Sequence, residues 1–365
     1  MQKLNGNDLK INQPAKWDCY DTAGALLLRK GSVIASQRQL DALLEQGLLT
    51  DPQAAPTAAY PSPFRRMTDI QLRLRMLYSN LTTARATDFP NQVLKISRDL
   101  QSVCEFDADA ALGILFLGDD GRYTITHPLH VAILCELAAK HLEIAAGSRL
   151  YIVAAALTSN IAMIELQNTL QKQQSPLTGE QSEKIQLHPL QAVDMLRQAG
   201  VKDEIWINAV LHHHERLDGK GYPGALRGDQ ISLPARILSL ADTYSAMISP
   251  RNYRVVKFAR EALRTTFLKR GAEMDESLAH LFVNELGVFP PGAFVTLQNE
   301  EVAIVVRRGT NAMEPQVKSV LSSKGVPLAA PILRDSGQDT YAIREMIPPS
   351  KGFVINRQLL WDYAE

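Results

Sequence analysis

Apolar residues recur at intervals of three and four positions over most of the stretch from about residue 67 to residue 287. This spacing places them along one face of an α-helix, so the region is constrained to be mainly helical. The pattern runs through MTDIQLRLRMLYSNLTTAR, NQVLKISRDLQSVCEFDADAALGILFL, HPLHVAILCELAAKHLEI, LYIVAAALTSNIAMIEL, HPLQAVDMLRQAG, DEIWINAVLHHHERL and LPARILSLADTYSAMIS. Loops are expected near residues 171–186 and 216–232, and the predicted fold class is mainly α.

The two ends of the chain have different patterns. Residues 1–50 predict a small α+β module, with short strands in AKWDCYDTAGALLLRKGSVI and a helix in SQRQLDALLEQGLL. Residues 51–66 are rich in proline and alanine, as in a linker. Near LGVFPPGAFVTLQNEEVAIVVRRG the period changes to alternation. Residues 288–365 therefore predict a β-rich appendage, with strands in FVTLQ, EEVAIVV and DTYAI and a short final helix near INRQLLWDYAE.

Composition narrows the classes of partner and compartment. The 39 basic and 39 acidic side chains cancel, so overall charge favours neither a nucleic-acid polymer nor a membrane surface. Cys19, Cys104 and Cys135 form no CxxC pair, which argues against a disulfide framework or a structural zinc site. We see no secretory signal, and no apolar run approaches the roughly 18 residues of a membrane span. The sequence predicts a cytoplasmic protein without a membrane partner.

Histidines and aspartates in the helical region form a candidate metal constellation: His127, His188, His213, His214, Asp218 and Asp242. A lone histidine is most often a surface or core residue, and we expect this of the remaining ones, His130, His141, His212 and His280. Asp242 lies in the apolar helix ARILSLADTYSAMI, where a carboxylate is costly unless it is paired or bound to a cation. Imidazole and carboxylate together suit iron, manganese or zinc.

The spacing of the histidines limits how they can meet. His213 and His214 are adjacent, so on a helix they point about 100° apart and can share a site only at its edge or at a helix end. His188 is expected to open a helix, with Pro189 in the first turn.

The loop DGKGYPGALRGDQISLP has a different character. Its glycines, including Gly219, Gly221 and Gly224, allow tight turns and close approach of a ligand. Tyr222 offers a ring face for stacking and a hydroxyl for phosphate. A plain turn-rich connection between helices explains the loop equally well.

These residues carry a resemblance. The stretch HHERLDGKGYPGALRGDQISLPARILSLADTYSAMISPRNYR resembles the signature half of the HD-GYP family, a branch of the metal-dependent HD phosphohydrolases. HHE, DGxGYP, LxG, ARI, the aspartate of LAD and RxYR occur in order. Upstream, HPLHVAILCELAA and LTGEQSEKIQLHPLQAVDML resemble further family segments, so the likeness covers about residues 115–285. It implies an HD-type helical bundle within residues 67–287.

The resemblance also implies a chemistry. Family members bind two or three metal ions and hydrolyse cyclic di-GMP, a bacterial second messenger. The implied metal ligands here are His127, His188, His213, His214 and Asp242. The residues implied to contact the nucleotide are Gly221, Tyr222, Pro223, Arg251 and Arg254.

The chain departs from the family where the defining histidine–aspartate pair should stand. A helix resembling LLHDIGK is replaced by LTSNIAM, so Ser159 and Asn160 occupy the pair's positions and Met163 replaces a phosphate-facing lysine. Tyr123 stands where some members carry an additional metal-binding glutamate. A hydroxyl and a neutral amide are poor metal ligands. We therefore expect iron, manganese or another divalent metal to be held weakly or singly, or no metal at all.

Three functions are compatible with this pattern. The first is a degenerate, catalytically impaired domain that acts as a cyclic di-GMP receptor or a scaffold for signalling proteins. The second is an active metal-dependent phosphodiesterase with an altered metal site. The third is a purely structural interaction platform, and a homodimer is compatible with all three. The missing pair favours a protein that is not an active enzyme.

Overall fold

The computed structural model describes most of the chain: residues 2–3, 10, 19–20, 26–28, 34, 37, 40–41, 49–50, 62–82, 88–117, 122–249, 259–268, 270–271, 273–348 and 355–363. The chain divides into two compact units, Met1–Pro61 and Ser62–Glu365. In the first unit, short strands form an antiparallel sheet in the order β1-β4-β2-β3. Their bounds are Gln2–Lys3 (β1), Cys19–Tyr20 (β2), Leu26–Leu28 (β3) and Leu49–Thr50 (β4).

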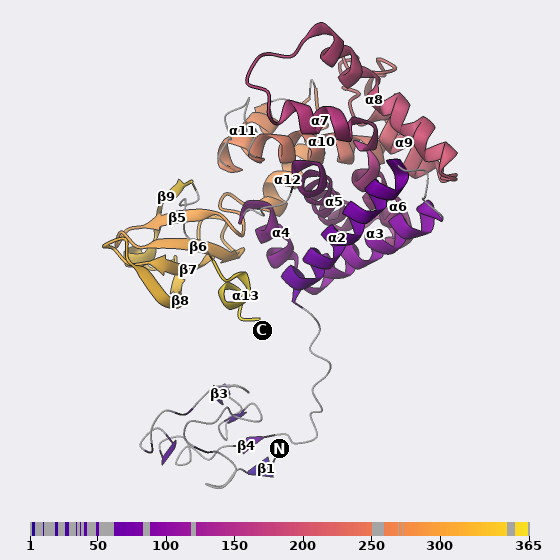
Figure 1. Ribbon diagram of the computed structural model, residues 1–365. Coiled ribbons are helices and arrows are strands. Elements are labelled where there is room, and N and C mark those ends of the chain that lie inside the picture. Colours follow the sequence, from indigo (N-terminus) through magenta and orange to yellow (C-terminus); the bar gives the residue numbers. More distant parts are fainter. Residues whose placement is uncertain are drawn as a thin grey trace. The chain divides into compact units, whose positions relative to one another are not determined.

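Helices make up most of the second unit (Figure 1). In chain order they are α2 Pro63–Thr82, α3 Phe89–Phe106, α4 Ala108–Phe116, α5 Tyr123–His141, α6 Ala146–Thr158, η1 Ile161–Met163, α7 Ile164–Leu170, α8 Gly179–Gln198, α9 Glu204–His212, η2 Gly228–Gln230, α10 Leu233–Ile248, α11 Ala259–Leu268 and α12 Glu276–Leu286. The predicted mainly helical fold is confirmed.

Helix α5 lies at the centre of the bundle. It contacts α2, α3, α4, α6, α7, α10 and α12. Nearly every residue from Tyr123 to Ala139 is buried, which matches a sequence that is apolar all round rather than along one stripe. The polar residues Thr124, His127, His130 and Glu136 on this helix are therefore buried as well.

One segment is long and apolar enough to cross a membrane, Ala146–Leu170, which comprises α6, η1 and α7. Of its most apolar window, 67% is buried inside the protein. The core helix of a soluble protein passes the same test, so the segment is weak evidence for a membrane span.

A buried ion pair joins three helices of the bundle. Glu136 of α5 is fully buried, and its two carboxylate oxygens accept hydrogen bonds from Arg149 Nε of α6 and Gln101 Nε2 of α3, each at 2.9 Å. Arg149 also donates to the Ile144 carbonyl at 2.8 Å. Because both charges are satisfied inside the bundle, the pair fixes how α3, α5 and α6 meet.

Asp107 divides what the sequence presents as one helical run over residues 91–117. It leaves the helix with extended backbone angles, and its side chain accepts from Ala110 N at 2.9 Å as the N-cap of α4. The same carboxylate binds Arg307 and Tyr363, both from the C-terminal part of the chain. The break is thus set by a cap and by distant partners together.

The expected loop over residues 171–186 is present but ends at residue 178, and the expected helix start at His188 is wrong. Helix α8 begins at Gly179, with Thr178 and Gln181 forming a reciprocal capping box, and Pro189 lies inside the helix. A capping box satisfies two N-terminal backbone donors locally, which outweighs the preference of proline for a first turn.

A five-stranded antiparallel sheet follows the helices, in the order β8-β7-β6-β5-β9. Its strands are β5 Phe294–Leu297, β6 Val302–Arg307, β7 Gln316–Leu321, β8 Pro327–Asp335 and β9 Ile343–Ile347. A short helix, α13 Arg357–Leu360, lies at the expected place. The predicted β-rich end is confirmed.

One expected strand is wrong in its placement. Most of DTYAI forms a 3-10 turn, η3 Asp339–Tyr341, and β9 begins only at Ile343. Arg334 of β8 stacks over the Tyr341 ring at 4.7 Å, so this aromatic residue contacts the strand at the other edge of the sheet while not lying in a strand itself. Strands β7 and β8 were not anticipated individually.

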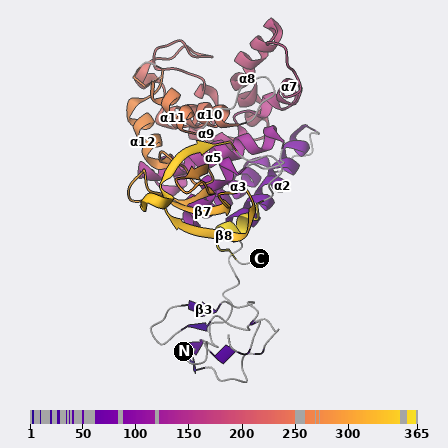
Figure 2. The same ribbon diagram turned by 90° about the vertical axis from the view of Figure 1, so that its left-hand side faces the viewer.

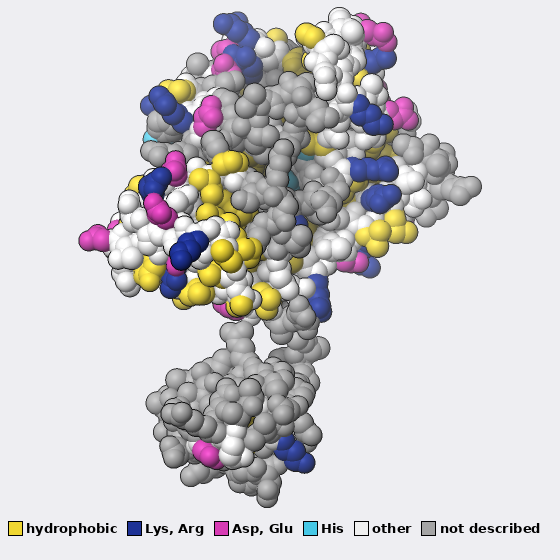
Figure 3. All heavy atoms as spheres, turned by 60° about the vertical axis from the view of Figure 1, so that its left-hand side comes forward, with side chains coloured by type: hydrophobic (Ala, Val, Ile, Leu, Met, Phe, Trp, Pro, Cys, Tyr) yellow, Lys and Arg dark blue, Asp and Glu magenta, His cyan; other side chains and the backbone are white. Residues whose placement is uncertain are grey.

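The sheet lies at one side of the bundle in Figure 1, and Figure 2 views the same sheet in front of the helices. Arg308, directly after β6, donates to Asp109 of α4 at 2.6 Å and to Glu285 of α12 at 3.1 Å. Together with the Arg307–Asp107 contact, these ion pairs join the sheet to two helices. Over the face drawn in Figure 3, acidic and basic side chains of the described residues are interspersed.

The buried pair gives a stability prediction. Glu136→Gln should lower the free energy of unfolding by about 3 kcal/mol, because buried Arg149 then keeps only the longer carboxylate contact, to the exposed Glu105 at 3.5 Å. This free energy is measured by chemical denaturation of the full chain. Glu183→Gln, at an exposed position of α8, is the matched control and should change it by less than about 0.5 kcal/mol. Equal losses in the two variants would contradict a special role of the pair.

Candidate metal and nucleotide site

Three imidazoles converge in the bundle. His188 of α8, and His213 and His214 directly after α9, offer ring nitrogens that all lie within 4.8 Å of one another. The ring centroids of His213 and His214 are 4.0 Å apart, and each lies about 5 Å from that of His188. Helix α9 ends at His212, so the adjacent pair meets at a helix end, one of the two geometries expected from the sequence.

Pro189 explains how His188 is aimed. A proline has no backbone N–H, so the carbonyl four residues earlier, that of Ile185, loses its helical donor. His188 Nδ1 lies 2.6 Å from this oxygen. Since a carbonyl only accepts, Nδ1 carries the proton, and Nε2 is left as a free acceptor.

His213 is oriented in the same way. Its Nδ1 donates to the Val210 carbonyl at 2.7 Å, so its Nε2 is likewise an acceptor. The two Nε2 atoms lie 3.2 Å apart. Two acceptors cannot hydrogen-bond to each other, but two nitrogen ligands about 2.0–2.2 Å from one metal ion would be separated by about this distance. The donor set therefore fits a cation.

The protonation states agree with this geometry. Burial lowers the pKa of His188 to about 3 and lowers the pKa values of His213 and His214 as well. The imidazoles are therefore neutral at pH 7, which is the form that binds metals.

His127 and Asp242 form a second group. His127 Nε2 lies 2.9 Å from Asp242 Oδ1, and its Nδ1 lies 3.0 Å from Ser245 Oγ. Burial acts to raise the pKa of Asp242, but the hydrogen bond from His127 and the nearby imidazoles outweigh it and lower the pKa below its ordinary range. This supplies the partner that a carboxylate in an apolar helix requires.

The glycine-rich loop folds back on the histidines. A Cβ on Gly221 would lie 2.6 Å from the His214 carbonyl oxygen and 2.4 Å from Arg216 N, so only glycine fits there. The next residue, Tyr222, donates its N–H to the same carbonyl at 3.2 Å. Its ring lies 4.9 Å from the His214 ring. The Tyr222–Pro223 peptide bond is cis.

Asp218 does not join the histidines. It accepts both guanidinium contacts of Arg216, at 3.2 and 2.8 Å, and the N–H of Lys220 at 3.0 Å. Arg216 also reaches Glu273 at 3.2 Å. Arg216 thus ties the loop to the segment that precedes α12, and Asp218 holds the Arg216 guanidinium.

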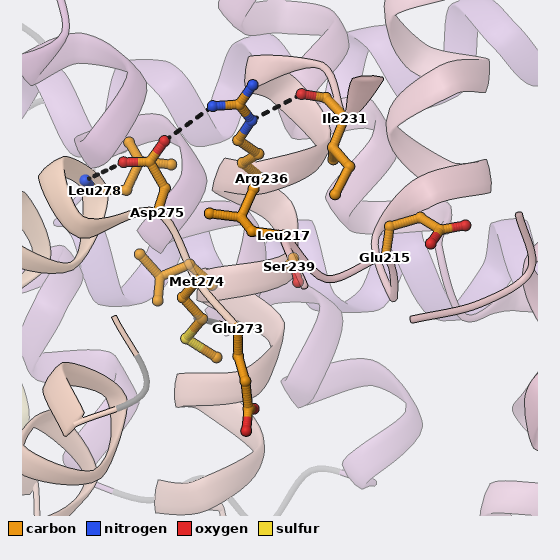
Figure 4. Close-up of a pocket in the computed structure, with 10 residues that line it drawn as sticks. Glu215, Leu217, Ile231, Arg236, Ser239, Glu273, Met274, Asp275 and Leu278 are labelled. Carbon is orange, nitrogen blue, oxygen red and sulfur yellow. Dashed lines mark hydrogen bonds and ion pairs between the residues drawn. The ribbon is translucent and has the colours of Figure 1, made fainter. Parts of the chain in front are cut away.

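Below the loop lies a cavity of about 20 Å³, lined by residues that include Glu215, Arg236 and Asp275 (Figure 4). Arg236 donates to the Ile231 carbonyl at 2.7 Å and to Asp275 at 3.1 Å. A volume of this order holds about one water molecule, so the cavity is an anchoring point of the loop and not a nucleotide site.

The segment that departs from the family pattern is buried in the bundle. Ser159 is fully buried, and its Oγ lies 3.3 Å from Asn160 Nδ2. Met163, in η1, is 8% exposed, and η1 packs on α8, which carries His188. Trp206 Nε1 donates to Thr158 Oγ1 at 2.7 Å and fixes the end of α6.

Most sequence-predicted residues can be placed. The structure brings His188, His213 and His214 together with Tyr222, and it pairs His127 with Asp242. Arg251 and Arg254 lie outside the described residues. Tyr123 stacks on His127, with ring centroids 4.8 Å apart.

Sequence reasoning missed several supporting groups. Ser245 and Glu215 were not singled out, and the role of the Ile185 carbonyl was not foreseen. A proline directly after a histidine, in a segment with a capping box upstream, was the available signal for that carbonyl.

Comparison with known proteins agrees with the fold. A family model described as HD domain matches residues 117–278. Bd1817, a solved structure described as a HDG"Y"P protein from Bdellovibrio bacteriovorus, superposes with a TM-score of 0.53 at 14% identity, over 77% of this chain and 98% of that one. At this identity the likeness shows the fold alone.

Curated relatives share parts of the sequence. Cyclic di-GMP phosphodiesterase PA4108 of Pseudomonas aeruginosa is 30% identical over 222 residues, 60% of this chain and 53% of that protein. The 3'3'-cGAMP-specific phosphodiesterase 3 of Vibrio cholerae is 31% identical over 141 residues, 39% of this chain and 30% of that protein. The chain thus spans about half or less of the length of these relatives.

Buried His130 gives a pH prediction. Burial, with a smaller contribution from His127, lowers its pKa to about 3. In the unfolded chain the pKa is about 6.5, so below that pH only the unfolded state takes up the proton and stability falls as pH falls. Between about pH 6.5 and about pH 5, protonation of this histidine in the unfolded state should lower the free energy of unfolding by about 2 kcal/mol.

His130→Met should remove that part of the pH dependence of the free energy of unfolding, measured by chemical denaturation at several pH values. His280→Met, at a histidine whose side chain is 55% exposed, should leave it unchanged. If the free energy of unfolding of His130→Met fell with pH as steeply as that of the parent, His130 would not be a buried neutral imidazole.

Proposed function

We propose that residues 117–278 form a degenerate HD-GYP domain that binds a cyclic dinucleotide, and that the protein is a catalytically impaired receptor in bacterial cyclic di-GMP signalling. The relatives named as cyclic di-GMP or cGAMP phosphodiesterases support this ligand class. The cytoplasm, where such a messenger is met, is the proposed location.

One observation carries the proposal. Three neutral imidazoles converge beside the Tyr222 ring, while the positions of the defining pair hold Ser159 and Asn160. The first half is the arrangement of a site for metal and nucleotide. The second half lacks a carboxylate to bridge two metal ions and to offset their charge, so a dinuclear site is disfavoured.

The residues fit a single divalent metal. His188, His213 and His214 supply three nitrogens, and the His127–Asp242 pair is close enough to influence their pKa values. Iron, manganese and zinc all accept such ligands. When bound, the metal would supply positive charge for the phosphate of a ligand, and Tyr222 would present its ring to a base. Arg251 and Arg254 are proposed to contact phosphate.

A second function is favoured by one specific observation. All five remaining family ligands, His127, His188, His213, His214 and Asp242, are present and lie in the same bundle, which is more than a scaffold requires. An active phosphodiesterase with an altered metal set is therefore the alternative.

Turnover and binding can be measured together. Protein purified without oxygen and supplied with iron or manganese should bind cyclic di-GMP in calorimetry but release no linear dinucleotide in chromatography. Linear product would instead support the altered enzyme. If the protein neither bound cyclic di-GMP nor released product, both functions would be contradicted and only an interaction platform would remain.

Metal content tests the mononuclear site. The protein should hold about one divalent ion per chain after dialysis, because three imidazoles can hold one ion and the bridging carboxylate for a second is missing. His213→Ala should weaken metal binding by at least about 10–100-fold, since it removes a direct ligand. His280→Ala is the control with no expected loss. Two tightly bound ions in the parent would contradict the degenerate site.

Restoring the missing pair is the complementary test. Ser159→His with Asn160→Asp should raise metal content above the parent, because an imidazole and a bridging carboxylate return. Adding Met163→Lys should strengthen the phosphate contact and allow turnover of cyclic di-GMP. A triple variant that binds no more metal than the parent would show that LTSNIAM is not the segment that faces the metals.

A further inference from the structure

A buried carboxylate holds the loop that carries Tyr222. Glu215 is 3% exposed, and its Oε1 accepts from Gly224 N at 2.5 Å while its Oε2 accepts from Leu226 N at 2.9 Å. Among the residues that the structure describes, no lysine or arginine forms an ion pair with it. Its charge is therefore offset by backbone N–H groups of one loop, and charge-assisted bonds of this kind are stronger than neutral ones.

The same loop is held at a second place, three residues before Gly224. Gly221 packs so closely that an added Cβ would lie 2.5 Å from Glu215 Cα. The Tyr222 N–H binds the His214 carbonyl at 3.2 Å. Tyr222 is thus fixed on one side by the backbone of His214 and on the other by the carboxylate of Glu215.

The geometry argues against other roles for this carboxylate. Both of its oxygens already accept backbone N–H groups, and it does not belong to the described cluster of metal-ligating nitrogens formed by His188, His213 and His214. Glu215 directly follows His214 in sequence, so it links the metal-facing and ligand-facing parts of the site without contacting a metal itself.

We infer that Glu215 is a positioning residue: it holds the segment from Gly221 to Leu226 so that the Tyr222 ring lies beside His214, ready to stack on a nucleobase. This inference rests on the proposed function, because Tyr222 contacts a base only if the site takes a cyclic dinucleotide. Stacking on an aromatic ring is worth about 1–3 kcal/mol per base, so a misplaced ring has a measurable cost.

The first experiment needs no ligand. Amide hydrogen exchange is followed in the metal-loaded full chain for the parent, Glu215→Gln and Glu183→Gln. A glutamine has one acceptor oxygen and turns an N–H group toward the second donor, so one bond is lost. The amides of Gly224 and Leu226 should exchange ~10-fold faster or more in Glu215→Gln, with exchange in α10 unchanged. Loop exchange equal to that of Glu183→Gln overturns the inference.

A second variant perturbs the same contact from the loop side. Gly224→Ala places a Cβ 3.1 Å from Glu215 Oε1, so the carboxylate must shift by a few tenths of an ångström. The same two amides should exchange faster, by less than in Glu215→Gln. This variant keeps the carboxylate, so it remains decisive if Glu215→Gln does not fold. No change in it counts against the clamp.

The second experiment uses cyclic di-GMP titrated by calorimetry. Glu215→Gln should weaken binding about 10-fold while metal content stays that of the parent, and Tyr222→Ala should weaken it by a similar or larger factor. The double variant should bind no worse than Tyr222→Ala alone, because the carboxylate acts through that ring. Additive losses, or unchanged affinity in Glu215→Gln, overturn the positioning role.

The two experiments separate the failure modes. If the parent binds no cyclic di-GMP, the proposed function fails, whereas faster loop exchange in Glu215→Gln still supports the clamp. If the parent binds and the loop exchange does not respond, the clamp fails and the proposed function stands.

Discussion

The hydrogen bond between His127 of α5 and Asp242 of α10 joins two helices at the centre of the bundle. Both side chains are buried, and a buried carboxylate without a partner would be strongly disfavoured. The pairing sets the rotation of α5 against α10, and it places Asp242 close enough to the other imidazoles to influence their pKa values. The site's polar side chains thus satisfy one another inside a bundle of mostly apolar helices.

The rest of the site is aimed by backbone carbonyls rather than by other side chains. His188 and His213 each donate Nδ1–H to a carbonyl three residues earlier in their own segment. This orientation does not depend on what occupies positions 159 and 160. The three convergent imidazoles are therefore held whatever side chains stand at positions 159 and 160, because they are oriented by separate contacts.

The loop and the sheet are both connected to α12. Asp275, its N-cap, binds Arg236 beneath the loop, and Glu285, in its last turn, binds Arg308 beside the sheet. Charged residues are used here at the ends of one helix, where their partners come from elements far apart in sequence. The buried Glu136–Arg149 pair likewise joins α5 to α6, and Glu136 also joins α5 to α3 through Gln101.

The sequence by itself determined the helical period, the change to alternating strands near residue 290, and the residue types that could bind metal and nucleotide. These follow from local spacing and side-chain chemistry, and most helices were found where the pattern predicted them. Only the tertiary structure decided that α8 begins at Gly179, that Asp107 breaks a helical run, and that DTYAI turns before β9 begins. It also decided which groups orient the site, since Ser245 and Glu215 are defined by partners and not by spacing. A local pattern reports which face of an element is apolar; it cannot report which distant donor or acceptor meets a buried polar atom.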